Sequence, residues 1–364
     1  MTRTSARHLR PTVVGAGLVA LDVVLNDIED DEPKYLAGGT CGNVLTVLSF
    51  LGWNARPIAR LRDDLPAEWI HEDLQCCGVD TSLLTATRDG STPIIIERIR
   101  ERSDGQRYHS YSLRCPCCGS YLPGYKSIRG KDAYSLTQEL HGYQVFFFDR
   151  VSRGTLNLAT HSLERGALVV FEPSGVGDPR LFREAWNLAH VVKYSNDRLR
   201  DMADLNIKSS VRNSLFLEIE TLGASGLRYR SRLDGASHTR WNTLDAVPSP
   251  SFRDAAGSGD WCTAGVLNKL ARGGLAGFRK VNSTRLKDAL RYGQALSAWN
   301  CSYESARGGM YEASRPQFDR QIRALLSGKT IRIAVEKADP LAEHLPKLCP
   351  NCDELQRKTR SHAS

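Results

Sequence analysis

The sequence predicts an α/β sandwich with a mainly parallel sheet, and three observations support this fold class. Short apolar or β-branched runs alternate with helical patterns along most of the 364-residue chain, and strands that alternate with helices form parallel sheets joined by crossovers. Hydrophobic residues make up 41% of the chain and charged residues 25%, which is typical of a globular protein. No stretch approaches the roughly 20 apolar residues of a membrane-spanning helix, so we expect no membrane partner.

The first third of the chain is predicted to contain strands, two helices and a hairpin. Residues 12–25 form an apolar run that suits two buried strands joined by a turn, and residues 38–53 have helical spacing after a glycine pair. A short strand is expected at 58–61 and a helix at 68–77. Two β-rich runs within 92–113 flank an Asp-Gly turn, which is the pattern of a β-hairpin.

From residue 145 onward, the expected strands and helices alternate regularly. The expected strands are 145–148, 168–171, 191–194, 216–221 and 227–232. The expected helices are 155–165, 179–188, 260–271 and 283–298. We therefore divide the chain into a basic arm (1–11), a main α/β domain (12–330, with the hairpin and a cysteine group at about 90–125) and a C-terminal extension (331–364).

Charge and cysteine content limit the class of protein. The 49 Lys and Arg against 41 Asp and Glu give a net charge of +8, which suits an enzyme that handles phosphates. The N-terminus lacks the apolar segment of a secretion signal, so we expect a cytoplasmic protein. Five of the ten cysteines form two close groups, within 115–118 and 349–352. Because stable disulfides are rare in the cytoplasm, metal binding is the better interpretation of these Cys-x-x-Cys pairs.

The most informative segment is 254–261, Asp-Ala-Ala-Gly-Ser-Gly-Asp-Trp, which leads into an apolar helix. Its small residues allow backbone N–H groups to converge on an anion, and the start of the helix adds its positive dipole end. Asp260 is either an ordinary N-cap of this helix or a carboxylate beside a bound phosphate, placed to accept the proton of an attacking hydroxyl. The residues alone leave both interpretations open.

This segment resembles the C-terminal signature of the ribokinase-like (PfkB) carbohydrate kinases, commonly Asp-Thr-x-Gly-Ala-Gly-Asp. The resemblance implies a ribokinase-like three-layer sandwich with a small β-lid, and ATP-dependent phosphorylation of a sugar hydroxyl. By matching position, Gly257, Ser258 and Gly259 would form the anion hole for the transferred phosphoryl group, and Asp260 would be the catalytic base. Ala255 departs from the usual Thr or Ser.

Two further segments resemble the family's substrate motifs, in the expected order along the chain. Gly38 and Gly39, followed by Asn43, are similar to the N-terminal Gly-Gly-x-x-x-Asn motif. In the family these glycines let the backbone approach the sugar, and the Asn contacts its hydroxyls. Asp22 resembles the family Asp that holds two substrate hydroxyls. Each motif is weak alone, and their joint order carries the resemblance.

The nucleotide side matches the family in part. Thr221, Gly223 and Gly226 resemble a strand-end Thr-x-Gly-x-x-Gly that lies beside the ATP phosphates. In the element that resembles the family's Lys-x-Asn-x-x-Glu, Ser195 replaces the Asn and Arg198 replaces the Glu associated with magnesium. The resemblance implies ATP and Mg²⁺ as cofactors. Arg198 favours a different class as an alternative, a catalytically weak kinase-like sensor of its ligand.

Other interpretations of the glycine-rich segments fit less well. Residues 15–20 match Gly-x-Gly-x-x-Ala, but the helix that a dinucleotide-binding motif needs does not follow. The P-loop and the protein-kinase motifs are absent from the sequence. Within the kinase class, a nucleoside is the nearest alternative to a sugar as the phosphate acceptor.

The two cysteine groups predict a structural zinc site. Residues 115–119, Cys-Pro-Cys-Cys-Gly, contain a Cys-Pro-x-Cys-Gly that resembles a zinc-ribbon knuckle, and residues 349–352, Cys-Pro-Asn-Cys, repeat its spacing. One knuckle offers two thiolates and a structural zinc takes four, so the predicted ligands are Cys115, Cys118, Cys349 and Cys352. Cys117 is an alternative to Cys118, and two unrelated turns are the alternative to a shared site.

Zinc at these positions would pin the C-terminal extension to the lid, and would stabilise either the lid itself or a homodimer interface formed through it. Basic residues and tyrosines surround the first knuckle, but such residues more often form a solvated face than a nucleic-acid site. We therefore expect a small-molecule sugar or nucleoside and ATP as partners, rather than a nucleic acid.

Overall fold

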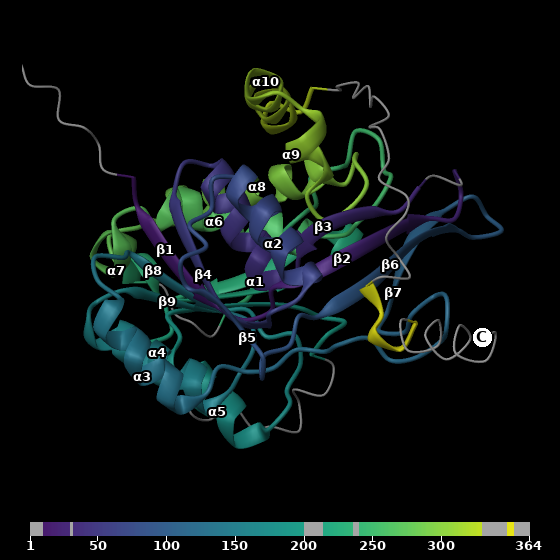
Figure 1. The fold of residues 1–364 in the computed structure, drawn as a ribbon. Helices are drawn as coiled ribbons and strands as arrows, with labels where there is room; N and C mark the ends of the chain where they lie inside the picture. Colours follow the sequence, from purple (N-terminus) through teal and green to yellow (C-terminus); the bar gives the residue numbers. More distant parts are fainter. Residues whose placement is uncertain (1–9, 30–31, 200–213, 236–239, 330–347, 353–364) are drawn as a thin grey trace, which may run out of the picture.

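The structure is a computed structural model that describes residues 10–29, 32–199, 214–235, 240–329 and 348–352. Within these residues a central sheet has the strand order β13-β12-β11-β10-β9-β8-β1-β4-β5 (Figure 1). Its strands are β1 (Thr12–Ala16), β4 (Asn54–Arg62), β5 (Leu84–Thr87), β8 (Val145–Phe148), β9 (Leu168–Phe171), β10 (Val191–Ser195), β11 (Leu217–Thr221), β12 (Leu227–Ser231) and β13 (Asn242–Leu244).

The strands from β11 to β5 are parallel, and β12 and β13 add an antiparallel edge. Sequence explains the parallel centre. Strands β8 (Val-Phe-Phe-Phe) and β9 (Leu-Val-Val-Phe) are apolar and buried at every position, as expected for strands covered on both faces. The predicted parallel sheet is therefore confirmed.

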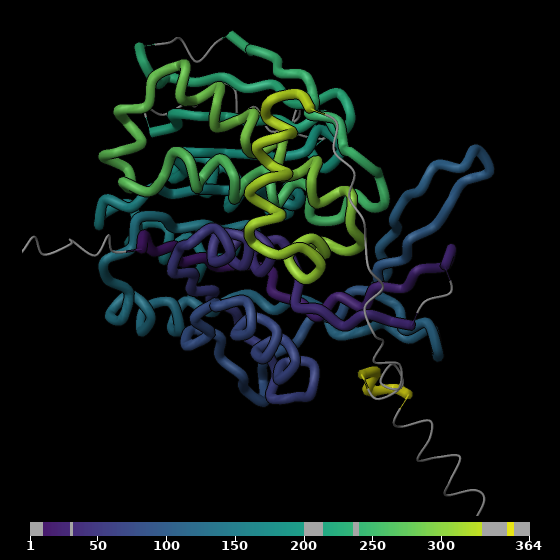
Figure 2. The backbone as a smooth tube through the Cα atoms, turned by 90° about the horizontal axis from the view of Figure 1, so that it is seen from above, coloured from purple at the N-terminus to yellow at the C-terminus, as the bar shows by residue number. Residues whose placement is uncertain are grey.

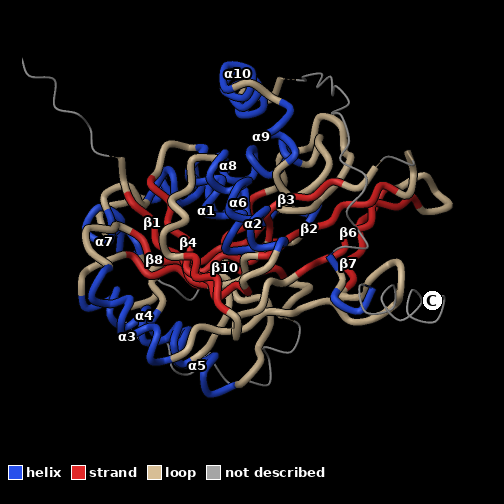
Figure 3. The backbone as a smooth tube through the Cα atoms, viewed as in Figure 1, coloured by secondary structure: helices blue, strands red, loops and turns tan. Residues whose placement is uncertain are grey.

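Helices cover both faces of the central sheet and complete a three-layer sandwich (Figure 3). One face carries α1 (Thr40–Phe50), α6 (Ser258–Leu270), α7 (Gly274–Phe278), α8 (Ser283–Asn300), α9 (Gly308–Glu312) and α10 (Arg315–Leu326). The other face carries α3 (Gly130–Glu139), α4 (Arg153–Glu164) and α5 (Pro179–Leu188). Local caps fix several helix starts: the side chain of Ser152 accepts the Thr155 N–H at α4, and that of Asn282 accepts the Arg285 N–H at α8.

A second, smaller sheet has the order β3-β2-β6-β7 and forms the lid. It consists of β2 (Ala20–Asn26), β3 (Lys34–Gly38), β6 (Ile94–Glu101) and β7 (Arg107–Ser112), with α2 (Leu65–Cys76) packed against β2 and β3. The predicted hairpin is the antiparallel pair β6–β7, which extends away from the body of the molecule in Figure 2. Because β1 of the central sheet leads directly into β2, the start of the lid lies next to the ends of the central strands.

Among the described residues, no helix combines the length and the apolar character required to cross a bilayer. The predicted basic arm at 1–11 and most of the C-terminal extension at 331–364 lie outside the described residues, apart from residues 10–11 and the five residues 348–352.

Candidate active site

The glycine-rich turn before α6 is shaped for an anion. Gly257 is the N-cap of α6 and has φ 66°, in the left-handed region that favours glycine. A Cβ at this position would lie 2.2 Å from the carbonyl oxygen of Ala306, so a larger residue does not fit. Ser258 and Gly259 follow in the first helical turn, where the positive end of the helix dipole favours an anion. The Ser258 N–H already donates to the Ala255 carbonyl at 3.1 Å. Because the start of a helix favours a bound anion, we call residues 257–259 the anion turn.

Asp260 lies in the same first turn, and its side chain faces another helix. Its Oδ2 accepts a hydrogen bond from Nδ2 of Asn43 on α1, at 2.8 Å. Because Gly257 is the N-cap and the carboxylate bonds Asn43, the interpretation of Asp260 as an ordinary helix cap is wrong. The pKa of Asp260 is raised to about 7, mainly by burial and also by the charge of Glu172, while the hydrogen bond from Asn43 acts to lower it. A carboxylate with such a pKa can accept a proton near neutral pH.

The carboxylate of Asp22 on β2 lies against the glycine pair Gly38 and Gly39 at the end of the neighbouring strand β3. A Cβ at Gly38 would lie 1.8 Å from Oδ2 of Asp22, and the Gly39 N–H bonds the same carboxylate. Burial raises the pKa of Asp22 to about 7, against the lowering effect of the Arg307 charge. Gly38 is therefore required because the carboxylate occupies the space that a side chain would fill. Gly39 has φ 79°, and a Cβ there would lie 2.6 Å from the carbonyl oxygen of Leu18.

Two buried oxygen atoms in this region accept no hydrogen bond from the described residues. They are Oδ1 of Asp22 and Oδ1 of Asn43. A buried polar atom without a partner is unfavourable, and both atoms are acceptors. A ligand with several hydroxyl groups would supply the missing donors.

A buried ion pair lies directly beside the anion turn. Lys193 is the first residue of the element that resembles Lys-x-Asn-x-x-Glu, but its partner Glu172 was not predicted. Nζ of Lys193 on β10 is 2.6 Å from Oε1 of Glu172, which follows β9. Oε2 of Glu172 accepts a 2.5 Å bond from Oγ1 of Thr263 on α6. A Cβ at Gly259 would lie 3.5 Å from the Lys193 ammonium. The signal that could have revealed the pair is a charged residue inside or just after an otherwise apolar strand.

A second buried carboxylate, Asp149, follows β8. Its Oδ1 accepts the Leu18 N–H at 2.9 Å, and its Oδ2 is 2.7 Å from Nη1 of Arg150. Burial raises the pKa of Asp149 to about 6, while Arg150 lowers it. Asp149, Glu172 and the start of α6 thus converge at the carboxyl ends of β8, β9 and β10, where open α/β sheets bind their ligands.

The predicted nucleotide residues meet at the ends of β10 and β11. Ser195 and Thr221 are partners in the parallel register, and a 3₁₀ turn (η3, Gly223–Ser225) follows. Gly226 has φ 92°, and a Cβ there would lie 2.2 Å from the carbonyl oxygen of Leu244. Arg198 follows on an exposed turn, and its charge lowers the otherwise raised pKa of Asp260. The structure thus brings the predicted nucleotide residues together at the carboxyl ends of β10 and β11, and the positive charge of Arg198 acts on the carboxylate of Asp260.

The four predicted zinc ligands also come together. The sulfur atoms of Cys115, Cys118, Cys349 and Cys352 all lie within 4.8 Å of one another. Cys117, the alternative ligand, is exposed and outside this cluster. The two knuckles therefore face each other across more than 230 residues of sequence.

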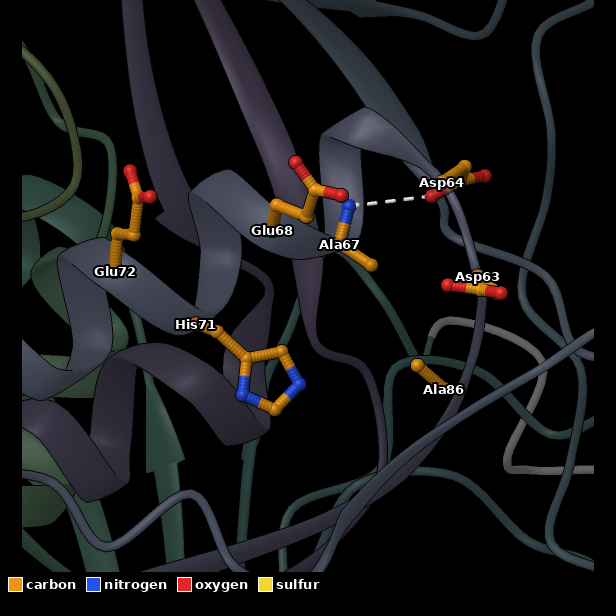
Figure 4. A pocket seen from close by; sticks show the side chains of 7 residues that line it. All are labelled: Asp63, Asp64, Ala67, Glu68, His71, Glu72 and Ala86. Carbon is orange, nitrogen blue, oxygen red and sulfur yellow. Dashed lines mark hydrogen bonds between the residues drawn. The ribbon is translucent and has the colours of Figure 1, made fainter.

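A pocket at the start of α2 is separate from the predicted site (Figure 4). It is lined by Asp63, Asp64, Ala67, Glu68, His71, Glu72 and Ala86. Asp64 uses its carboxylate to cap α2 by accepting the Ala67 N–H. The carboxylates that line this pocket would repel the phosphates of a nucleotide, so the pocket is a poorer candidate for a phosphate site than the glycine turn.

No family model matches the chain, and no curated protein matches it. Solved structures do. An aminoimidazole riboside kinase from Salmonella enterica, in complex with aminoimidazole riboside and an ATP analogue, has 20% identity and a TM-score of 0.60, and the alignment covers 86% of this chain and 99% of that one.

Two other kinases give similar matches. A fructokinase from Xylella fastidiosa with bound ATP has 16% identity and a TM-score of 0.65, with 88% of this chain and 99% of that chain covered. A nucleoside kinase from Burkholderia thailandensis in complex with inosine has 15% identity and a TM-score of 0.62, with coverage of 86% and 99%. At these identities the comparisons establish the fold, and the expected ribokinase-like fold is confirmed.

Proposed function

We propose that the protein is an ATP-dependent kinase that phosphorylates a hydroxyl group of a sugar or a sugar-like small molecule. One observation carries this proposal. A buried carboxylate with a pKa of about 7, that of Asp260, stands in the first turn of a helix that begins with an anion-shaped glycine turn, and it bonds Asn43. A base and a phosphate cradle side by side are the two parts that phosphoryl transfer to an alcohol requires.

The acceptor would bind between the lid and α1. Its hydroxyl groups would donate to the unpartnered Oδ1 atoms of Asp22 and Asn43, and one further hydroxyl would point toward Asp260. A hydrogen bond to a carboxylate such as that of Asp22 contributes about 1.5–3 kcal/mol, and one to a neutral amide such as that of Asn43 about 0.5–1.5 kcal/mol, so these two oxygens favour a ligand with several donors. Holding the alcohol in line with the phosphoryl group supplies the orientation that the reaction needs.

ATP would lie along the turn from Thr221 to Gly226, with its terminal phosphate over Gly257–Gly259. The buried Lys193 ammonium stands beside this turn and would stabilise the negative charge that develops on the transferred group. Asp260 would take the proton from the attacking alcohol as the phosphorus–oxygen bond to ADP breaks. The new bond joins the alcohol oxygen to phosphorus, so the products are a phosphate ester, ADP and one proton.

Mg²⁺ would supply further neutralisation of the ATP phosphates. The carboxylates nearest to the anion turn are already committed, Asp149 to Arg150 and Glu172 to Lys193, and Arg198 stands where the related kinases have a magnesium-associated Glu. We therefore propose that the ion enters with ATP, bound mainly by the phosphates, as is usual for Mg²⁺ in such sites.

A nucleoside acceptor is the second candidate, and Tyr111 favours it. This side chain on the lid strand β7 is 53% exposed, although burial around its hydroxyl and the negative charges of Glu97, Asp254 and Asp22 raise its pKa. The ring is exposed and its hydroxyl is near the carboxylates of the acceptor side, so the ring is placed to stack on a planar base.

An acceptor screen tests the proposal. The purified protein is mixed with ATP, Mg²⁺ and panels of sugars and nucleosides, and both ADP release and the phosphorylated product are measured, with Asp260→Asn as the control variant. We expect ADP release that depends on one acceptor class and that the variant lacks. Binding of an acceptor without any turnover would support the sensor alternative, and neither binding nor turnover on any panel would refute the proposal.

A further inference from the structure

We propose that Cys115, Cys118, Cys349 and Cys352 hold a structural Zn²⁺ ion that fastens the C-terminal segment 348–352 to the foot of the lid. The site is inferred from the arrangement of the four sulfur atoms, so it does not depend on the proposed kinase activity. Figure 1 shows the segment in yellow beside the end of β7.

The distances between the four sulfur atoms fit a tetrahedral ion. Zinc–thiolate bonds are about 2.3 Å long, so the sulfur atoms of a regular tetrahedral site are about 3.8 Å apart. Sγ of Cys115 is 3.6 Å from Sγ of Cys352, and Sγ of Cys118 is 3.6 Å from Sγ of Cys349. All four sulfurs lie within 4.8 Å of one another, so a single ion at the centre reaches each of them.

The backbone of the first knuckle supports two thiolates. The Cys117 N–H donates to Sγ of Cys115 at 3.4 Å, and the Ser120 N–H bonds the sulfur of Cys118. Gly119 closes the turn with φ 72° and an N–H bond to the Cys115 carbonyl at 2.9 Å. N–H donors to sulfur stabilise the thiolate form that binds zinc.

The second knuckle is equally compact and is buried. The Cys352 N–H donates to the Cys349 carbonyl at 3.0 Å, and both cysteines are less than 7% exposed. Leu348 packs with Leu122 and with lid-strand residues such as Ile94 in one apolar cluster. Metal binding by the four cysteines would add to this apolar packing, because each metal–thiolate bond couples the segment to the first knuckle.

A pair of disulfides is the alternative bonding of the same four atoms. Sulfur atoms in a disulfide are about 2.05 Å apart, whereas both close pairs here are at 3.6 Å. In addition, each sulfur of one knuckle lies near both sulfurs of the other, which suits one shared ion better than two separate bonds.

The segment that carries Cys115 and Cys118 is hydrogen-bonded to the lid strand that lies next to the predicted acceptor residue Asp22. Residues 113–123 return to the lid sheet, where the Ile94 N–H donates to the Pro123 carbonyl. Ile94 pairs with Leu21 on β2, the neighbour of Asp22. If the proposed function holds, zinc removal will therefore weaken acceptor binding more than ATP binding.

Metal analysis of the full chain tests the site directly. We expect about one zinc per chain in the purified protein, and release of this zinc when the thiols are modified by a mercurial reagent. Cobalt(II) substitution should give the intense visible and near-ultraviolet absorption of a tetrahedral thiolate complex. A protein without zinc that also fails to bind Co²⁺, or an intact mass that shows two disulfides, would overturn the proposal, whatever the kinase assay shows.

Cysteine variants identify the ligands. Cys118→Ser and Cys349→Ser should lose most of the zinc, whereas Cys117→Ser and Cys76→Ser should keep it, because these two thiols are exposed and lie outside the cluster. Cys118→His should restore zinc with an altered Co²⁺ spectrum, since histidine is also a zinc ligand. Full zinc content in the Cys118→Ser and Cys349→Ser proteins would refute this ligand set, and the metal content of the unmodified protein tests the site even if these variants do not fold.

Discussion

The acceptor side of the proposed active site and its nucleotide edge are built in opposite ways. On the acceptor side, the functional groups are the side chains of Asp22, Asn43 and Asp260, all buried. At the nucleotide edge, Ser195 and Thr221 are half-buried at the ends of neighbouring strands, and an exposed glycine turn follows them.

Under the proposed function, this difference predicts that the acceptor side sets the substrate specificity. Binding of a phosphate acceptor that lacks the matching hydroxyl is unfavourable, because a buried oxygen of the protein is then left without a hydrogen-bond partner. Backbone N–H groups in a glycine turn grip phosphates whatever the neighbouring side chains are. Under the proposed function, a nucleotide edge held by backbone groups can therefore tolerate the side chains of Ser195 and Arg198, whereas a substitution on the acceptor side would leave a buried oxygen unpaired.

The largest effect is expected from Asp260→Asn, which keeps the size of the side chain but removes the base. Loss of a general base reduces a rate by about 10²–10⁴-fold, so kcat should fall by that factor while binding of ATP changes little. Asp63→Asn, an exposed carboxylate outside the site, serves as the control and should leave kcat unchanged. An Asp260→Asn protein that folds and keeps its full turnover would exclude a base role for Asp260.

Asp22→Asn is expected to weaken the acceptor side selectively. A hydrogen bond to a charged group contributes about 1.5–3 kcal/mol, or roughly 10- to 150-fold in affinity, so the acceptor KM should rise by this factor while the ATP KM stays within about twofold. Similar increases in both KM values would show that the two sides are not separate.

Asp22→Asn weakens acceptor binding, but it is expected to stabilise the folded protein at high pH. The folded state raises the pKa of Asp22 from 3.8 to about 7, so the folded protein holds this proton more tightly than the unfolded chain. Stability is then lost as pH rises from about 4 to 7. Asp22→Asn should therefore raise the melting temperature at pH 8 and have little effect near pH 4, as thermal unfolding at both pH values would show.

The local motifs were predictable because each is contiguous in sequence. The roles proposed for Gly257–Gly259, Asp260, the glycine pair and Asn43 came from the resemblance of these contiguous motifs to a known family. Strands such as 145–148 and 168–171 follow from their continuous apolar runs alone, and these runs match β8 and β9. The pairing of the two cysteine groups followed from counting ligands, since one knuckle provides only half of a zinc site.

What sequence could not provide depends on contacts between distant segments. Strand β3 (Lys34–Gly38) exists because it pairs with β2, and its few residues carry no periodic signal. Helix α10 buries only Phe318 and Ile322, too few positions to stand out from a polar background. The ion pair of Lys193 and Glu172 joins residues 21 positions apart, and the pKa of Asp260 near 7 comes from burial by elements far from it in the chain.

A smaller effect is expected from pH on the reaction itself. Burial raises the pKa of Asp260 to about 7, and the base must be unprotonated to accept the proton of the alcohol. The rate kcat/KM should therefore rise about tenfold per pH unit below 7 and level off above it. A pH profile for the unmodified protein measures this, and a profile that is flat between pH 5 and 8 would separate Asp260 from the rate-determining proton transfer.

The smallest effect is expected at the nucleotide edge, from Thr221→Ala. The Thr221 side chain is half-buried, and its hydroxyl makes only a long hydrogen bond of 3.4 Å to the Tyr194 carbonyl. The variant can therefore lose at most one neutral hydrogen bond to ATP. Such a bond contributes about 0.5–1.5 kcal/mol, or roughly 2- to 10-fold, and this increase should appear in the ATP KM but not in the acceptor KM. A loss as large as that of Asp260→Asn would mean that side chains, rather than backbone, hold the nucleotide. The contrast between the two sides of the site would then disappear, and the tolerance of this edge to Ser195 and Arg198 would need another explanation.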